Sequence, residues 1–270
     1  MSDVVRLEYR DVTMRFAQTI GGGVLTAIHG VSFSVRDGEV VSLIGPSGCG
    51  KSTLLNIGSG LAAPSEGQTL VDGERVEGPN AQVAFMLQKD LLLPWRTIAE
   101  NVMFGVEIQG LSAVERRKRA QTQLAKLNLA EFSNHYPHQL SGGMRQRVAL
   151  ARTLAVDPHV LLLDEPFSAV DAQTRMVLQR DLAQTLKQAG KTALLITHDL
   201  LEAVTLSDRV LVMSRRPGTI IDEIAIELPH RDDPIARRRE PKANDYVARL
   251  MDRLDIGHDS LERQPAGDAP

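Results

Sequence analysis

The sequence predicts an α/β fold with a mixed central sheet, an N-terminal antiparallel β subdomain and an inserted helical subdomain. Three continuous apolar runs, at 160–163, 193–196 and 210–213, alternate with helical patterns in the second half of the chain. Such runs are typical of strands covered on both faces, and their alternation with helices predicts parallel pairing through crossovers. Near the N-terminus, residues 31–35 alternate between apolar and polar, as in a half-buried strand.

The first half of the chain supplies the β-rich part of this prediction. Short alternating or apolar runs are separated there by Asp-Gly pairs, which are turn signals. The expected elements, in chain order, are a strand at 31–35, a turn at 37–38, a strand at 40–44, a hairpin of 69–71 and 75–76 around 72–73, and a strand at 82–87.

Helical patterns appear in the middle and in the second half of the chain. From Ile98 to about Leu129 the sequence becomes helical and charged, which interrupts the strand rhythm and indicates an insertion. Leu178, Leu182 and Leu186 then form one helical stripe, which Gly190 ends.

The C-terminal part has a different character. The chain becomes polar after Pro229, although Tyr246, Leu250 and Leu254 have the spacing of a short amphipathic helix. The final residues have the composition of a disordered tail. The expected parts are an α/β core with its β subdomain at 4–97 and 159–228, a helical subdomain at 98–158, a C-terminal helical extension at 229–257 and a disordered tail at 258–270.

Composition narrows the functional classes. The 270 residues are 43% hydrophobic and 24% charged, which is ordinary for a globular protein, and the net charge of −3 gives no argument for nucleic-acid binding. Cys49 is the single cysteine, which fits a reducing compartment. We expect no signal peptide and no membrane span, because no apolar run approaches the roughly 20 residues that a span needs. Any membrane role must then act through a partner.

A glycine-rich segment follows the strand at 40–44 and opens a helical run. Residues 45–52 read Gly-Pro-Ser-Gly-Cys-Gly-Lys-Ser and fit the phosphate-loop pattern; the flanking strand and helix argue against the alternative of a plain glycine turn. Backbone amides and the helix dipole there can meet a phosphate chain. Lys51 is expected to reach the β- and γ-phosphates, and the Ser52 hydroxyl to bind Mg²⁺. The expected triphosphate-binding residues are Gly45, Pro46, Ser47, Gly48, Cys49, Gly50, Lys51, Ser52 and Thr53.

Polar side chains stand directly after three of the predicted strands. Asp164 and Glu165 end one strand, so Asp164 is expected to hold Mg²⁺ and Glu165 to act as general base or to orient water. His198 follows another strand and can hydrogen-bond the γ-phosphate, while Gln88 can ligate Mg²⁺ and orient water. The alternatives are an acidic loop, a structural histidine and a surface glutamine.

A second anion-binding feature begins at Ser141. Ser141 is a good helix N-cap, and Gly142 and Gly143 expose backbone amides at the positive end of the helix that follows. A second phosphate-binding helix start is redundant within one chain but becomes useful if it faces the ATP of another copy. We therefore expect a two-fold dimer that encloses two ATP molecules.

Over about residues 4–228 the chain resembles the ATP-binding subunit of an ABC transporter. The matching motifs are Walker A at 45–52, the Q-loop at Gln88, the signature at Leu140–Met144, Walker B at 160–165, the D-loop at Ser168–Asp171 and the H-loop at His198. The resemblance implies a P-loop NTPase of the ABC type with a RecA-like core, ATP and Mg²⁺ as cofactors, Asp171 in the ATP site and Phe16 stacked on adenine. An ordinary strand aromatic is the alternative for Phe16. Met144 and Leu87 depart from common family residues without putting hydrolysis in doubt.

A narrower resemblance comes from Leu92-Leu93-Pro94-Trp95, which follows the Q-loop. It is similar to importers of nitrate, sulfonates and taurine, and it implies that residues 88–97 dock a separate permease. It further implies a solute-binding protein and a peripheral place at the cytoplasmic face of the inner membrane. An exposed Trp95 with Leu92 and Leu93 would suit docking, whereas packing within the helical subdomain is the alternative.

Two other functions remain open at this stage. One is a soluble ABC ATPase in DNA repair or translation, and the other is a regulatory subunit that binds ATP without hydrolysis. The chain has no room for a long coiled-coil insertion, and it carries both Glu165 and His198. These features favour the importer ATPase, and the solute itself is not encoded in any motif of this chain.

Overall fold

The fold contains two sheets that share one buried layer. The computed structural model describes residues 3–18, 23–168 and 170–255. In the larger sheet all neighbouring strands are parallel except the pair at one edge, so the predicted mixed sheet is confirmed. In spatial order its strands are β10 (Ile220–Ala225), β9 (Arg209–Met213), β3 (Val40–Ile44), β8 (Thr192–Ile196), β7 (Val160–Asp164) and β6 (Val83–Met86).

The smaller sheet is antiparallel, as predicted for the N-terminal part of the chain. Its long strands alternate between buried and exposed residues, because one face packs on the core and the other faces solvent. The expected hairpin around Asp72-Gly73 is present. In spatial order the strands are β2 (Val24–Arg36), β1 (Val5–Ala17), β4 (Glu66–Val71) and β5 (Glu74–Arg75).

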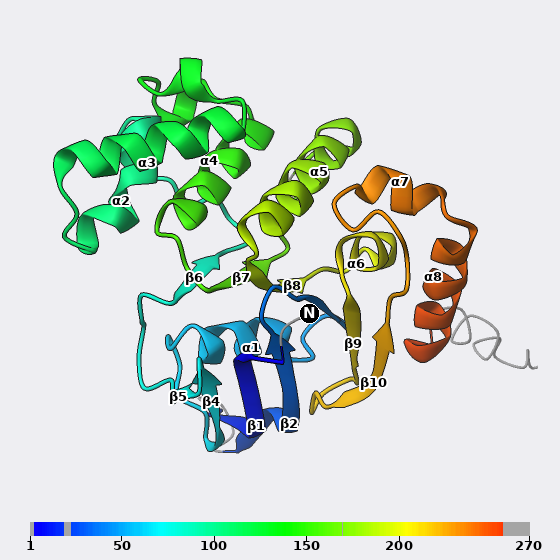
Figure 1. The fold of residues 1–270 in the computed structure, drawn as a ribbon. Coiled ribbons are helices and arrows are strands. Elements are labelled where there is room, and N and C mark those ends of the chain that lie inside the picture. The colour runs from blue at the N-terminus through cyan, green and yellow to red at the C-terminus, as the bar shows by residue number, and fades with distance from the viewer. Residues whose placement is uncertain (1–2, 19–22, 169, 256–270) are drawn as a thin grey trace, which may run out of the picture.

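Helices cover both faces of the larger sheet (Figure 1). Helices α2, α3 and α4 contact one another and fall within the region predicted to be a helical insertion. Thr97, Ser112 and Ser141 start them by accepting a hydrogen bond from a backbone N–H of the first turn. The helices are α1 (Lys51–Gly58), α2 (Ile98–Ile108), α3 (Ala113–Lys126), α4 (Gly142–Ala155), α5 (Ala172–Ala189), α6 (Leu200–Leu206), α7 (Pro234–Arg239) and α8 (Pro241–Arg253). The division of the chain into separate parts stays a prediction.

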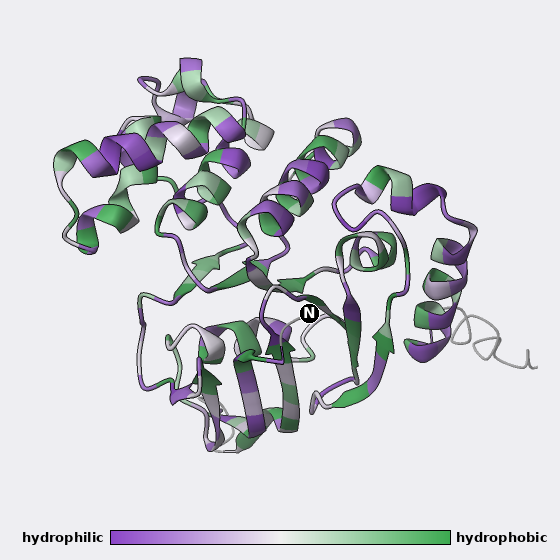
Figure 2. Cartoon of the chain, in the orientation of Figure 1, coloured by the Kyte–Doolittle hydropathy of each residue, from purple (hydrophilic) through white to green (hydrophobic). Residues whose placement is uncertain are grey.

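Buried side chains on the larger sheet alternate between its two faces. Along β7, Leu161 and Leu163 pack with helices α2–α5, whereas Val160 and Leu162 pack with α1 and the smaller sheet. In Figure 2 the strands of the larger sheet are largely green, the colour of hydrophobic residues, which agrees with burial on both faces. Each face therefore needs its own covering layer, which fixes the order of layers in the fold.

The C-terminal part packs against the edge of the larger sheet that carries β9 and β10. In α8, Leu250 is fully buried and Tyr246 packs beside it, so the predicted amphipathic helix is confirmed. Residues 256–270 lie outside the described part of the chain, and the whole expected tail at 258–270 lies among them. Within the described residues, no helix is long and apolar enough to cross a membrane.

One buried arginine joins α7 to this edge. Arg237 is 2% exposed, and its guanidinium donates to the carbonyl oxygens of Ser207 at 2.8 Å, Leu228 at 3.1 Å and Pro229 at 3.1 Å. Burial lowers the pKa of Arg237, and nearby Asp208 opposes that shift. Because Arg237 is buried, removing its guanidinium would take away the donor that pairs these carbonyls.

Replacing Arg237 with methionine should lower the free energy of unfolding by roughly 2–4 kcal/mol, because several buried carbonyls lose their donor. Thermal or urea denaturation of the full chain measures this. Arg238→Met, on the exposed side of the same helix, is the control and should change little. Equal losses for the two variants would contradict the role given to Arg237.

Candidate functional site

The phosphate loop joins β3 to α1 as the sequence predicts. Gly50, at the start of α1, has φ 107°, and a side chain on it would collide with Ile28 of β2. Lys51 is 8% exposed, and its ammonium donates to the carbonyls of Gly45 at 2.8 Å and Pro46 at 3.0 Å. The lysine therefore lies folded across the loop that should hold a phosphate chain.

Asp164 and Glu165 stand at the end of β7, beside this loop. Burial raises the pKa of Asp164, and the nearby Glu165 raises it further, while a hydrogen bond from Ser52 and the charge of Lys51 oppose the shift. This contact brings the hydroxyl oxygen of Ser52 next to a carboxylate oxygen of Asp164. Glu165 has φ 46°, an unusual backbone conformation for a non-glycine residue, and its N–H donates to the carbonyl of Ile196 at 3.0 Å.

The three predicted catalytic side chains meet at one carboxylate oxygen. Gln88 Nε2 donates to Oε2 of Glu165 at 3.0 Å, and His198 Nδ1 lies 3.3 Å from the same oxygen. These residues follow β6, β7 and β8, which are neighbours in the sheet. Their carboxyl ends lie at one edge because the strands are parallel, so residues 110 positions apart become neighbours (198 − 88 = 110).

A pocket extends from the phosphate loop toward the smaller sheet. Its lining includes Lys51, Ser52, Thr53 and Glu165, together with Phe16 of β1. The remaining lining residues are Leu25, Ala27, Ser47, Gly48, Gly50 and Arg216. Six of the nine predicted phosphate-binding residues thus share one pocket with Phe16, which is 43% exposed.

Residues 28–168 match the sequence pattern of the family described as ABC transporter. The chain belongs to the ABC transporter family. An uncharacterized ABC transporter ATP-binding protein of Methanocaldococcus jannaschii is 44% identical over 229 residues, which is 85% of this chain and 85% of that protein. The taurine import ATP-binding protein TauB of Jannaschia sp. is 42% identical over 249 residues, 92% of each chain.

Solved structures agree with the family. The ATP-binding cassette MJ0796, in a dimeric post-hydrolysis state bound to ADP and Pi, matches with a TM-score of 0.73 at 33% identity. The match covers 82% of this chain and 99% of that one. This ABC protein is therefore an ATPase with the P-loop NTPase fold of the ABC type that the sequence predicts.

The signature helix of this ABC protein lies apart from the phosphate loop of its own chain. Ser141 caps α4 by accepting from the Met144 N–H at 3.3 Å, as predicted. Gly142 lines a different pocket, which it shares with Gln88 and Ser168 rather than with Lys51. At Gly143, a side-chain carbon would lie 2.9 Å from Thr174 of α5, so the glycine lets the two helices approach.

The D-loop connects Walker B to α5. Asp171 caps α5 by accepting from the Thr174 N–H at 3.1 Å, and this hydrogen bonding holds the pKa of Asp171 below its usual value. Within the same loop, Ala169 lies outside the described residues. Asp171 is not among the residues that line the pocket of Lys51, so its role in the ATP site stays a prediction.

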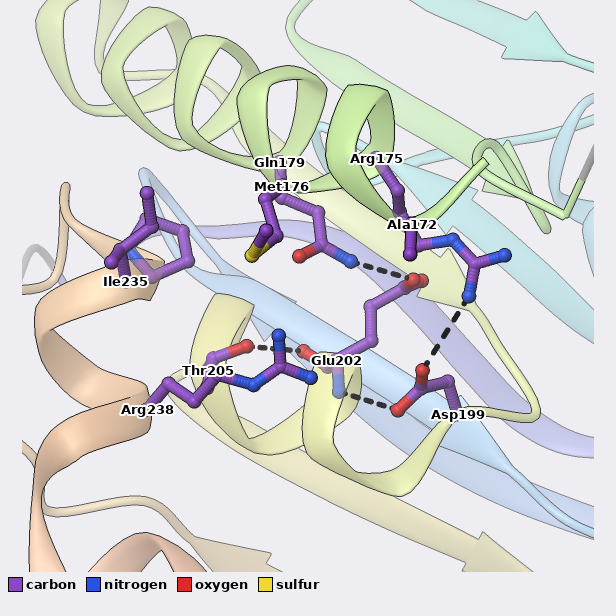
Figure 3. A pocket seen from close by; sticks show the side chains of 10 residues that line it. Ala172, Arg175, Met176, Gln179, Asp199, Glu202, Thr205, Ile235 and Arg238 are labelled. Atoms are coloured by element: carbon purple, nitrogen blue, oxygen red, sulfur yellow. Dashed lines mark hydrogen bonds and ion pairs between the residues drawn. The ribbon is translucent and has the colours of Figure 1, made fainter. Parts of the chain in front are cut away.

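Sequence reasoning missed a set of contacts behind the D-loop and H-loop. Arg175 donates to the carbonyl of Val170 at 3.0 Å and lies 3.8 Å from the carboxylate of Asp199, the residue after His198. Figure 3 shows this pair and a second link between α5 and α6, in which Gln179 donates to Glu202 at 3.0 Å. The sequence offers no signal for these pairs, because they join residues whose partners are set by helix packing.

Arg216, from the β9–β10 turn, is a second residue that the motifs did not reveal, although it lines the pocket of the phosphate loop. The structure also separates the two alternatives that the sequence left open for Leu92 and Trp95. Leu92 is 9% exposed and packs in the core with α2 and α4, whereas Trp95 is 72% exposed. The apolar run is therefore divided between the core and the surface.

Glu202 should make stability depend on pH. Burial raises its pKa from 4.5 to about 7, with a smaller raising effect from Asp199 and opposing hydrogen bonds from Thr197 and Gln179. The folded state keeps this proton between pH 4.5 and about 7 while the unfolded state loses it, so stability falls as pH rises through that window.

Glu202→Gln removes this titration. The variant should gain roughly 2 kcal/mol of stability relative to the parent chain between pH 5 and pH 8, measured by urea denaturation at both pH values. Glu131→Gln, at an exposed position, serves as control and should parallel the parent chain. A constant difference between Glu202→Gln and the parent at both pH values would contradict the assignment.

Proposed function

We propose that this protein is the ATP-hydrolysing subunit of an importer and that it acts as a homodimer coupled to a separate permease. The observation that carries the proposal is the separation of two helix starts on one chain. Lys51 begins α1 in one pocket, while Gly142 begins α4 in another. Each helix start suits an anion, and a second copy can complete both sites at once. The dimeric form of the MJ0796 structures supports this arrangement.

Within each site the side chains divide the chemistry. Lys51 and the loop amides would hold the phosphates of ATP, and Phe16 would stack on adenine. Ser52, Asp164 and Gln88 offer oxygen atoms, the donors that Mg²⁺ prefers, and a bound Mg²⁺ would neutralise phosphate charge.

Hydrolysis would then rest on the group centred on Glu165. Its carboxylate can accept a proton from the attacking water, since Gln88 and His198 already contact one of its oxygens and hold it in place. His198 is 68% exposed, which leaves its other ring nitrogen accessible to a γ-phosphate. Ser141, Gly142, Gly143 and Asp171 would act on the ATP of the other copy.

The surface around Trp95 fits permease docking because it is both apolar and rigidly held. Asn101 is fully buried, and its side chain bonds the Leu93 N–H at 2.7 Å and the carbonyls of Arg96 and Thr97 at 3.1 and 3.0 Å. This network fixes the turn that exposes Trp95. A rigid, exposed tryptophan is the residue type most enriched among binding hot spots.

Two arginines of the signature helix α4 hold the start of this docking segment. Arg145 donates to the carboxylate of Asp90 at 3.0 Å. Arg152 donates to the backbone carbonyls of Asp90 at 2.7 Å and Leu91 at 2.9 Å. A movement of the permease at residues 88–97 would therefore be transmitted to the signature residues at the start of α4.

The solute is proposed from the relatives. TauB proteins of Jannaschia sp. and Yersinia pestis, named for taurine import, are 42% and 45% identical. They favour a small solute such as taurine, another sulfonate or nitrate, delivered by a solute-binding protein. The subunit would sit peripherally at the cytoplasmic face of the inner membrane. A DNA-repair role is disfavoured, since the longest described helix is α5 with 18 residues, too short for the long coiled coil of such proteins.

Mixing two inactive variants tests the shared site. Lys51→Ala destroys the phosphate loop, and Ser141→Arg blocks the signature helix. A heterodimer of the two has one intact site, so a 1:1 mixture should recover up to about a quarter of the parental ATPase rate. Each variant alone should be inactive, and no recovery after confirmed subunit exchange would contradict the shared site.

Trp95→Ala should weaken association with the permease at least tenfold, because a buried aromatic anchor is lost from the interface. The ATPase rate of the isolated subunit should stay unchanged. Leu61→Ala, another exposed apolar residue that lies outside this segment, is the control. Co-purification with the co-expressed permease measures binding, and unchanged association of Trp95→Ala would remove Trp95 from the docking surface.

A further inference from the structure

The turn between β9 and β10 packs its backbone directly on the phosphate loop. The Gly218 N–H donates to the carbonyl of Ala27 at 2.9 Å, and the His29 N–H donates to the carbonyl of Gly218 at 3.0 Å. A side chain at Gly218 would collide with the carbonyl of Cys49 in the loop. The turn therefore lies between β2 and the loop, at the lower side of the sheet in Figure 1.

Arg216 extends from this turn to the middle of the loop. Its Nε and Nη2 both donate to the carbonyl oxygen of Gly48, at 3.1 and 2.8 Å. No carboxylate within the described part of the chain forms an ion pair with Arg216. The guanidinium also lines the pocket that contains Phe16 and Lys51. Its contact with the loop is thus made through hydrogen bonds to backbone, without a competing ion pair.

This contact fixes one peptide group of the loop at both ends. In a trans peptide the carbonyl and the next N–H point in opposite directions. Arg216 holds the Gly48 carbonyl, while the Cys49 N–H on the other side donates to the carbonyl of Pro46 at 3.3 Å. Gly48 has φ 75° and glycine moves easily between backbone conformations, so the loop needs an external support to keep one shape.

We propose that Arg216 is a positioning residue of the nucleotide site that holds the phosphate loop in its ATP-binding shape before ATP arrives. Preorganisation lowers the entropy that binding must overcome, so it raises affinity. Once the loop amides hold the phosphates, they maintain the loop themselves, and the hydrolysis step is unaffected. The inference deepens the proposed function and rests on ATP being bound by this loop.

The test compares Arg216→Ala, Arg216→Lys and Arg216→Gln in the full chain with Mg²⁺-ATP. Arg216→Ala should raise both the Kd of a fluorescent ATP analogue and the KM for ATP about tenfold, the effect of losing a charge-assisted hydrogen bond. The kcat should stay within about twofold. Lysine and glutamine each keep a side-chain N–H donor that can reach toward the Gly48 carbonyl, so they should restore part of the affinity. Arg117→Ala, exposed on α3, should behave as the parent chain.

Several outcomes would overturn the inference. Unchanged Kd for Arg216→Ala would show that the loop keeps its shape alone. A fall in kcat as large as the rise in KM would show that Arg216 acts in another way. The same conclusion would follow if neither the lysine nor the glutamine variant recovered any affinity for ATP. The nucleotide-free thermal midpoint checks the fold, and the lysine and glutamine variants serve if Arg216→Ala does not fold. Lys51→Ala separates the two proposals: normal ATP binding by that variant would contradict the phosphate loop itself.

Discussion

Parallel pairing of β3, β8, β7 and β6 is the constraint on which the site depends. The carboxyl ends of these strands carry the phosphate loop, His198, Glu165 and Gln88, so the register of the sheet sets the distances among them. Glu165 lies in the middle of this edge and contacts both of its neighbours. A shift of one residue in any of the strands would turn its side chains to the opposite face and separate the group.

The outer elements act on this edge through arginines. Arg216 joins the β9–β10 turn to the phosphate loop, Arg175 joins the D-loop to the residue after His198, and Arg152 joins the backbone of Asp90 to α4. All three donate to backbone carbonyls, which suits a rigid side chain with several donors. The site is therefore supported from several sides by residues outside its motifs.

Sequence reasoning succeeded where the signal was local. The apolar runs predicted the strands of the larger sheet, Ser141 predicted a helix cap, and the phosphate-loop pattern predicted its own strand-to-helix context. It left Leu92 open between surface and core, because an apolar run shows hydrophobicity but not which way each side chain points. The side chain of Asn101 hydrogen-bonds the backbone of Leu93 and Thr97 and so holds the turn that exposes Trp95. These bonds form only when the chain is folded.

The fold class, the order of the motifs and the polar residue types at each strand end could all be predicted from the sequence. These follow from patterns within a few residues, whose physical causes are local. Tertiary packing was needed to show that Gln88 and His198 contact the same oxygen of Glu165. It was also needed to show that Trp95 is exposed while Leu92 is buried. The contact between Arg216 and the Gly48 carbonyl likewise appears only in the folded chain. Those contacts join residues far apart in the chain, and packing of the layers alone brings them together.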